Sequence, residues 1–227
     1  MNNRSDSIWA AATAAMMIAA LYVTFVWVPT ERTMGIVQRI FYFHLPSFGV
    51  AVIAILVALV AGLRFLVNRD LRSDELAVSS VEIGLVFITV NLVTGSFWAR
   101  PIWGIWWTWD ARLTSAFVLW LMFVGYLILR RAIDEPSQRA VLSAVLTVFQ
   151  AVAAVIVYLA NRIWRTQHPQ PVIAGGEGSG LDPAMWVALL FCLAAMIVLY
   201  LRLLRLRRRL ERLRRELEGL RRTVHSL

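Results

Sequence analysis

The sequence predicts an all-α polytopic membrane protein with six transmembrane helices and a C-terminal cytoplasmic helix that is amphipathic or forms a coiled coil. Two observations predict this class. Of the 227 residues, 59% are hydrophobic and only 16% are charged, and the mean hydropathy is +0.67, which is too apolar for a soluble domain. Apolar runs of about 20 residues, the length needed to cross the hydrocarbon core of a bilayer, also recur along the chain.

Six apolar runs have the length and composition of a transmembrane helix. We interpret the first as a retained span, because it is long enough to cross a membrane and lacks a small-residue cleavage site after a short apolar stretch. An even number of spans places both termini on the same side. The six runs cover residues 8–28, 46–66, 78–98, 113–130, 140–160 and 184–202.

After residue 202 apolar residues alternate at spacings of three and four, with Arg and Glu between them, as in a coiled-coil seam. A basic amphipathic helix on the anionic inner leaflet is the alternative, supported by the excess of Arg over Glu. We favour a helix that extends from the sixth span and pairs with a partner. We therefore expect a membrane domain at 1–202 and a cytoplasmic heptad-patterned helix at 203–227, with apolar positions Leu203, Leu206, Leu210, Leu213, Leu217, Leu220, Val224 and Leu227.

The arginines predict the orientation. The chain has no lysine, and 17 of its 23 arginines lie before the first span, after the second and fourth spans, or after the sixth. Because cytoplasmic segments carry the excess of positive charge, both termini are expected in the cytoplasm, with the chain in the cell inner (plasma) membrane. The six arginines expected on the exoplasmic side are Arg32, Arg39, Arg100, Arg112, Arg162 and Arg165.

The segment 95–114, GSFWARPIWGIWWTWDARLT, contains five of the ten tryptophans and falls between the third and fourth spans, on the exoplasmic side. An interfacial aromatic belt is the simplest explanation. Belts scatter one or two aromatic residues per helix end, so this density instead favours a site for a large flat aromatic ligand. On a helix beginning at Pro101, four side chains would share one face by their i, i+3, i+4, i+7 spacing: Trp103, Trp106, Trp107 and Asp110.

Residues 103–114, WGIWWTWDARLT, resemble the tryptophan-rich WWD signature, WGxxWxWDxRLT, of the haem-handling proteins of cytochrome c biogenesis. Within that group the sequence is most similar to the cytochrome c maturation C (CcmC) family. The resemblance implies that the ligand is haem b, held without a covalent bond and carried as cargo. It covers roughly residues 8–202 and implies that Trp103, Trp106, Trp107 and Trp109 contact the haem.

Two histidines are expected on the same side of the membrane as the tryptophans. His44 lies where the second span begins, and His168 lies in the loop before the sixth span, whereas His225 belongs to the cytoplasmic tail. Neutral imidazole is a common axial ligand of haem iron. The resemblance implies this role for His44 and His168, one on each side of the iron.

Arg100 and Arg112 lie at either end of the tryptophans, and guanidinium groups bind carboxylates such as the haem propionates well. An exoplasmic salt bridge, for instance between Arg112 and Asp110, is an equally good interpretation. Asp110 is expected to cap or orient the loop rather than to contact iron.

The resemblance implies a protein that binds haem at the periplasmic membrane surface and delivers it to a periplasmic haem chaperone during c-type cytochrome biogenesis. The implied complex contains an ABC ATPase subunit, a second membrane subunit and a small single-span subunit. Without lysine the chain has no Walker A loop, and it has no C-x-x-C-H motif, so we expect neither an enzyme nor a c-type cytochrome. The net charge of +9 predicts no nucleic-acid partner, because the arginines lie at the edges of apolar runs, where anionic lipid headgroups are the better partner. The alternatives are a haem-lyase-like cytochrome c synthetase component, and a membrane scaffold or permease whose tryptophans are interfacial anchors.

Overall fold

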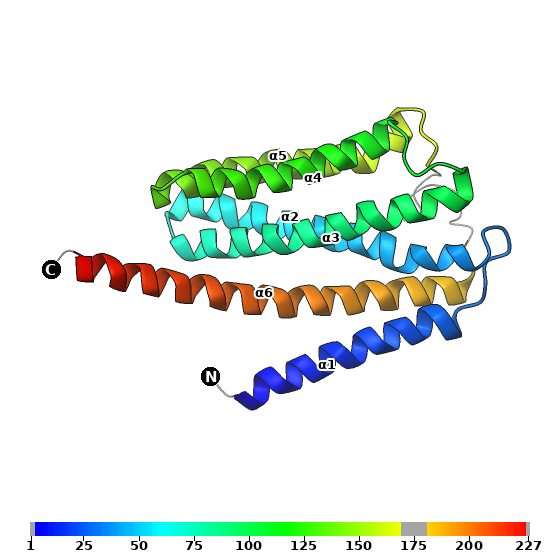
Figure 1. Cartoon of the computed structure of the whole chain (residues 1–227), viewed down its shortest axis with the longest axis horizontal. Helices are drawn as coiled ribbons and strands as arrows, with labels where there is room; N and C mark the ends of the chain where they lie inside the picture. Colours follow the sequence, from blue (N-terminus) through cyan, green and yellow to red (C-terminus); the bar gives the residue numbers. More distant parts are fainter. Residues whose placement is uncertain (1–2, 169–180, 226–227) are drawn as a thin grey trace.

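The computed structural model describes residues 3–168 and 181–225, and the described chain is all-α apart from one isolated bridge between Glu31 and Gly35. Six α-helices form an elongated bundle (Figure 1). They are α1 (Asn3–Tyr22), α2 (Phe41–Asn68), α3 (Leu71–Trp103), α4 (Ala111–Ala132), α5 (Pro136–Ile163) and α6 (Pro183–His225). A π-helical turn, η1 (Val23–Trp27), follows α1, and a 3-10 turn, η2 (Ile36–Ile40), precedes α2.

Successive helices run in opposite directions along the bundle (Figure 1). Both chain ends and the α2–α3 and α4–α5 connections lie at one end, which we call the terminal end. The α1–α2 and α3–α4 connections lie at the other end, which we call the loop end. All six helices are long and apolar enough to cross a membrane, which confirms the six predicted spans and makes the chain a multi-pass membrane protein.

The centre of the bundle is built from α2 and α3, with α4, α5 and α6 packed around them. Small residues on α2, such as Ala54 and Ala58, are fully buried there and let the helices approach closely. At Gly84 of α3 a Cβ atom would lie 2.7 Å from a ring carbon of Phe123 and 2.9 Å from Cβ of Ala54. The three helices therefore meet at a distance that only glycine permits at this position.

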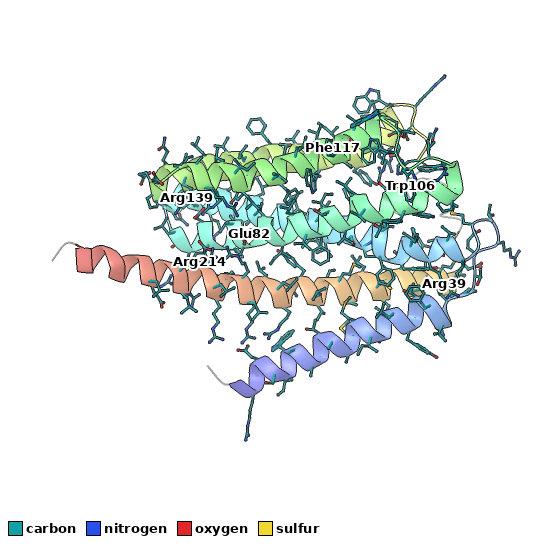
Figure 2. The ribbon with its side chains drawn as sticks, in the orientation of Figure 1. Arg39, Glu82, Trp106, Phe117, Arg139 and Arg214 are labelled. Atoms are coloured by element: carbon teal, nitrogen blue, oxygen red, sulfur yellow. The ribbon has the colours of Figure 1, made fainter. Side chains whose placement is uncertain are left out.

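Ion pairs join the helices near the terminal end. The Arg130 guanidinium of α4 donates to both carboxylate oxygens of Asp74 of α3, at 2.6 and 2.9 Å, and both side chains are almost completely buried. Arg207 of α6 donates to Glu82 of α3 and to Glu211. Figure 2 shows Glu82 on the part of α3 that faces α6.

One local expectation is wrong. Pro101 does not begin a helix: it lies in the last turn of α3, which ends because Gly104 adopts the left-handed conformation at φ 75°. Residues 104–110 are consequently not helical. The heptad-patterned residues continue the sixth span, as expected: helix-favouring Leu, Arg and Glu carry α6 without a break from Pro183 to His225, so they form no separate helix. Leu227 lies outside the described residues.

Candidate functional site

A cavity of about 330 Å³ opens at the loop end of the bundle, and we call it the histidine cavity because His44 and His168 both line it. Residues far apart in the sequence meet here, because α2 begins and α3 and α5 end at this end of the bundle. The other polar and aromatic residues in its lining are Phe41, Ser96, Trp98, Trp103, Trp106, Arg112, Asn161 and Gln167.

His44 lies in the first turn of α2 and is held by α3. Its Nδ1 atom is 3.1 Å from the carbonyl oxygen of Asn91 and 3.2 Å from Oγ1 of Thr94. Because a carbonyl oxygen can only accept a hydrogen bond, this contact assigns the proton to Nδ1 and leaves the lone pair on Nε2. The Asn91 amide nitrogen donates to the carbonyl oxygen of His44 at 2.9 Å and makes a longer 3.4 Å contact with Nε2, which a stronger ligand would replace.

The ring of His44 fits against α3 only because residue 95 is glycine. A Cβ atom at Gly95 would lie 2.9 Å from Cε1 of His44, closer than such contacts occur in proteins. The ring of Trp98 lies edge-on to the imidazole, with the centroids 5.7 Å apart. Asn91, Gly95 and Trp98 together therefore fix the position of the imidazole.

His168 follows the end of α5, and its ring packs edge-to-face on Trp103 with the centroids 5.1 Å apart. Burial, and then the positive charge of Arg112, lower the pKa of His168 to about 4, so its imidazole is neutral near pH 7. Its Nδ1 atom is buried and has no hydrogen-bond partner among the described residues. A buried polar atom left without a partner next to a cavity is the feature expected of a residue that binds a ligand there.

Asp110 organises the segment around His168 but does not line the histidine cavity. It is the N-cap of α4, where Oδ1 accepts from the backbone N–H of Leu113 at 2.9 Å. Oδ2 accepts from the backbone N–H of Gln167 at 3.2 Å. One carboxylate thus caps α4 and holds the residue before His168, which matches the capping role expected for Asp110.

The two arginines expected to bind propionates have different surroundings. Arg112 lines the histidine cavity, and its Nη1 atom donates to the carbonyl oxygen of Val157 at 3.1 Å and is 3.5 Å from Oδ1 of Asn161. The Arg112–Asp110 salt bridge considered as an alternative is not formed between these two described residues. Arg100 donates to the carbonyl oxygen of Gly104 and is exposed outside the cavity lining. Arg112 is therefore the cation available to a ligand in this cavity.

The four tryptophans of the motif divide into two groups rather than forming one surface. Trp103 and Trp106 line the histidine cavity, and Figure 2 shows Trp106 at the loop end of α3. Trp107 and Trp109 instead pack edge-to-face on each other and on Phe117 of α4, at centroid distances of 5.7 to 6.3 Å. They line a second, more open cavity of about 370 Å³ between α3 and α4. The division follows from the non-helical segment 104–110, which directs the tryptophans to different sides.

Sequence reasoning missed the residues that hold His44. Asn91 is detectable as a polar residue near the middle of an apolar span, and such residues are functional candidates by default. Gly95 gives no comparable signal, because a glycine in a membrane helix is common. Asn161 likewise carries no pattern that links it to Arg112.

Comparisons with known proteins all give the same description. The family model described as "Heme exporter protein C" matches residues 1–223. The chain is similar to Heme exporter protein C of Bradyrhizobium diazoefficiens, at 35% identity over 194 residues that cover 86% of this chain and 73% of that protein. The Rhodobacter capsulatus protein of the same description is 32% identical over 87% of this chain and 82% of its own length. The Escherichia coli K12 protein is 32% identical over 86% of this chain and 80% of its own length.

Proposed function

The chain belongs to the haem exporter protein C (CcmC) family, whose members are haem-handling membrane proteins of cytochrome c maturation, and we propose that it binds haem in the histidine cavity. In this proposal haem is cargo rather than a resident cofactor. The chain holds haem b without a covalent bond at the periplasmic surface and delivers it to a periplasmic haem chaperone.

The observation that carries the proposal is the meeting of His44 and His168 on one cavity beside Trp103. Nε2 of His44 keeps a lone pair for a metal because Nδ1 bonds to a carbonyl oxygen. His168 is neutral near pH 7 and has an unpartnered ring nitrogen, so both imidazoles suit axial coordination of iron. The tryptophan rings supply the apolar, polarisable contacts that a porphyrin requires.

Arg112 is the residue that we assign to a propionate. It is the arginine of the WWD motif that lines the histidine cavity, and its hydrogen bonds go to uncharged oxygens, so its charge is not neutralised by them. A guanidinium whose charge is not neutralised donates strong charge-assisted hydrogen bonds to a carboxylate. Trp107 and Trp109 of the motif, and Arg100 just before it, would act through the loop rather than by contact with this ligand.

The orientation and the assembly are part of the same proposal. The distribution of the arginines supports cytoplasmic termini in the inner membrane, which would put the loop end and its cavity in the periplasm. We further infer an ABC-type complex with a separate ATPase subunit, a second membrane subunit and a small single-span subunit. A separate ATPase is needed because the chain lacks lysine and hence a Walker A loop.

A pyridine haemochrome assay on the purified full chain tests the proposal. The wild type should carry haem, whereas His44→Ala and His168→Ala should lose or shift the Soret band. His225→Ala removes the remaining histidine, at the terminal end, and should leave the spectrum unchanged. A colourless wild-type protein would instead support a scaffold whose tryptophans are interfacial anchors.

A second pair of variants separates the two tryptophan groups. Trp103→Leu removes a ring that packs on His168 in the histidine cavity, and Trp109→Leu removes one that lines only the other cavity. Only Trp103→Leu should shift the Soret band. If Trp109→Leu shifts it as strongly, the haem is held in the cavity between α3 and α4 instead.

A further inference from the structure

The last part of α6 presents an uncovered row of leucines at the terminal end of the bundle. Leu206, Leu210, Leu213 and Leu217 are spaced four, three and four residues apart, so they lie on one side of the helix. Each is between 38% and 58% exposed within the described chain. We call these four residues the leucine seam. The seam is apolar, and its side chains stay exposed against the part of the chain whose side chains the structure describes.

The leucine seam lies beyond the hydrocarbon core of the bilayer. Six arginines occur between Arg202 and Arg212, and so many charges are too costly to keep in a membrane interior. Figure 1 shows that the C-terminal end of α6 continues past the ends of the other helices, and Figure 2 places Arg214 beside the start of α3. The seam therefore meets water, on the side of the membrane that holds both termini.

The direction of this helix argues against the membrane surface as the occupant of the seam. An interfacial helix lies in the plane of the membrane, whereas α6 continues its transmembrane part without a break (Figure 1). Ion pairs fix the base of the projecting part from two sides. Asp6 of α1 pairs with Arg205 at 3.2 Å, and Arg207 pairs with Glu82 of α3.

The charges beside the seam argue against a second copy of this chain. Three exposed charged residues flank the seam leucines: Arg209, Arg214 and Glu216. Two of the three are arginines, and Arg209 also forms an ion pair with Asp6 of α1 at 3.4 Å. In a parallel pair of identical helices Arg209 of one copy would face Arg214 of the other, because flanking positions five residues apart meet across a coiled coil. Arginine against arginine is repulsive there. A flanking glutamate on the partner would be attracted to both positions.

We propose that the leucine seam docks an amphipathic helix of a different polypeptide, one whose own leucine seam is flanked by glutamates. Leucines of the two helices would interdigitate, and Arg209 and Arg214 would select the acidic partner and set its register. Arg214 is exposed and lies near the terminal end in Figure 2. This interaction is independent of haem binding at the loop end.

A binding assay on the full chain in nanodiscs of neutral phosphatidylcholine tests this proposal. The probe is a fluorescent four-heptad peptide with leucine at the seam positions and glutamate at the flanking positions, and anisotropy reports its binding. A peptide with lysine at the flanking positions is the control. The glutamate peptide should bind more tightly, and its affinity should fall as salt is added.

Two arginine variants make the test specific. Arg214→Glu reverses a charge beside the seam and should weaken binding of the glutamate peptide about fivefold, the effect of exchanging an exposed attractive pair for a repulsive one. Arg212→Glu makes the same change of net charge but lies two residues after Leu210, away from the seam, and should bind like the wild type. Replacing Leu210 and Leu213 together by serine should cost more than about tenfold.

Each of the other outcomes overturns the proposal. Equal weakening by Arg214→Glu and Arg212→Glu would mean that the arginines attract any anion. Equal binding of the two peptides, or none, would mean that no acidic helix is selected. Dimers of the chain that dissociate when Leu210 and Leu213 are replaced would show that a second copy fills the seam. Because all four substituted side chains are exposed, each variant should keep its helical circular dichroism.

Discussion

Replacing Gly95 by alanine tests how the chain holds His44. The added methyl group would lie 2.9 Å from Cε1 and 3.5 Å from Nδ1 of the imidazole, so the ring must move. Its hydrogen bond to the carbonyl oxygen of Asn91, now 3.1 Å long, would lengthen or break. We expect Gly95→Ala to weaken haem binding much more than it changes the stability of the fold.

The expected magnitudes follow from these contacts. The lost hydrogen bond costs about 1 kcal/mol of folding free energy and a displaced side-chain rotamer about 1 kcal/mol more. Alanine in place of glycine inside α3 returns about 0.5–1 kcal/mol. The net change in unfolding free energy is therefore only about 1 kcal/mol. Loss of the hydrogen bond that orients a metal-binding histidine typically lowers metal affinity about 10- to 100-fold.

The assay is a haem titration followed at the Soret band, with thermal unfolding measured by circular dichroism on the same samples. Gly125→Ala in α4 is the matched control, since no other heavy atom lies within 4 Å of the added Cβ. It should bind haem like the wild type and be slightly more stable. Equal haem affinities for Gly95→Ala and Gly125→Ala would refute the role assigned to the orientation of His44.

Three further predictions concern groups around the two ends of the bundle. Arg130→Ala removes the guanidinium that binds both oxygens of the buried Asp74 carboxylate and should destabilise the protein by about 3–5 kcal/mol in thermal unfolding. Adding Asp74→Asn should restore part of this stability, and no recovery would contradict a buried ion pair. Asp110→Ala removes the α4 cap and the acceptor for the Gln167 N–H, so it should lower the free energy of unfolding by about 1 kcal/mol and weaken haem binding. Unchanged haem affinity would show that Asp110 only caps the helix. The pKa of His168 is about 4 in the folded chain and near 6.5 in an unfolded chain. Between these values only the unfolded chain binds the proton, so the stability that neutral His168 contributes should be complete above pH 6.5 and be lost as the pH falls towards 4. Histidine NMR of the haem-free protein should therefore show His168 neutral at pH 5, and a midpoint near 6.5 would contradict its burial.

The six spans were predictable because the thickness of a bilayer sets a minimum length for an apolar run, and no tertiary information is needed to measure that length. The location of His44 and His168 on the same side of the membrane followed from counting spans, since an even number of crossings between them returns the chain to that side. Topology alone thus brought both histidines to one end of the bundle, and the structure places both on one cavity.

The local geometry of the tryptophans was not predictable from their spacing. The first turn is the part of a helix that tolerates proline best, but Pro101 lies in the last turn of α3. The helical spacing of Trp103, Trp106 and Trp107 therefore occurs in a segment that is mostly not helical. The role of Gly95 depends on the distance between α2 and α3, which no pattern in one helix encodes.

The central claim is that His44 and His168 bind the two faces of one haem iron. Electron paramagnetic resonance of the ferric complex tests it most directly, because the signal distinguishes low-spin iron with two imidazole ligands from high-spin iron with one. We predict a low-spin signal for the wild type and a high-spin signal for His44→Ala and for His168→Ala. A low-spin signal that persists unchanged in either variant would contradict the claim.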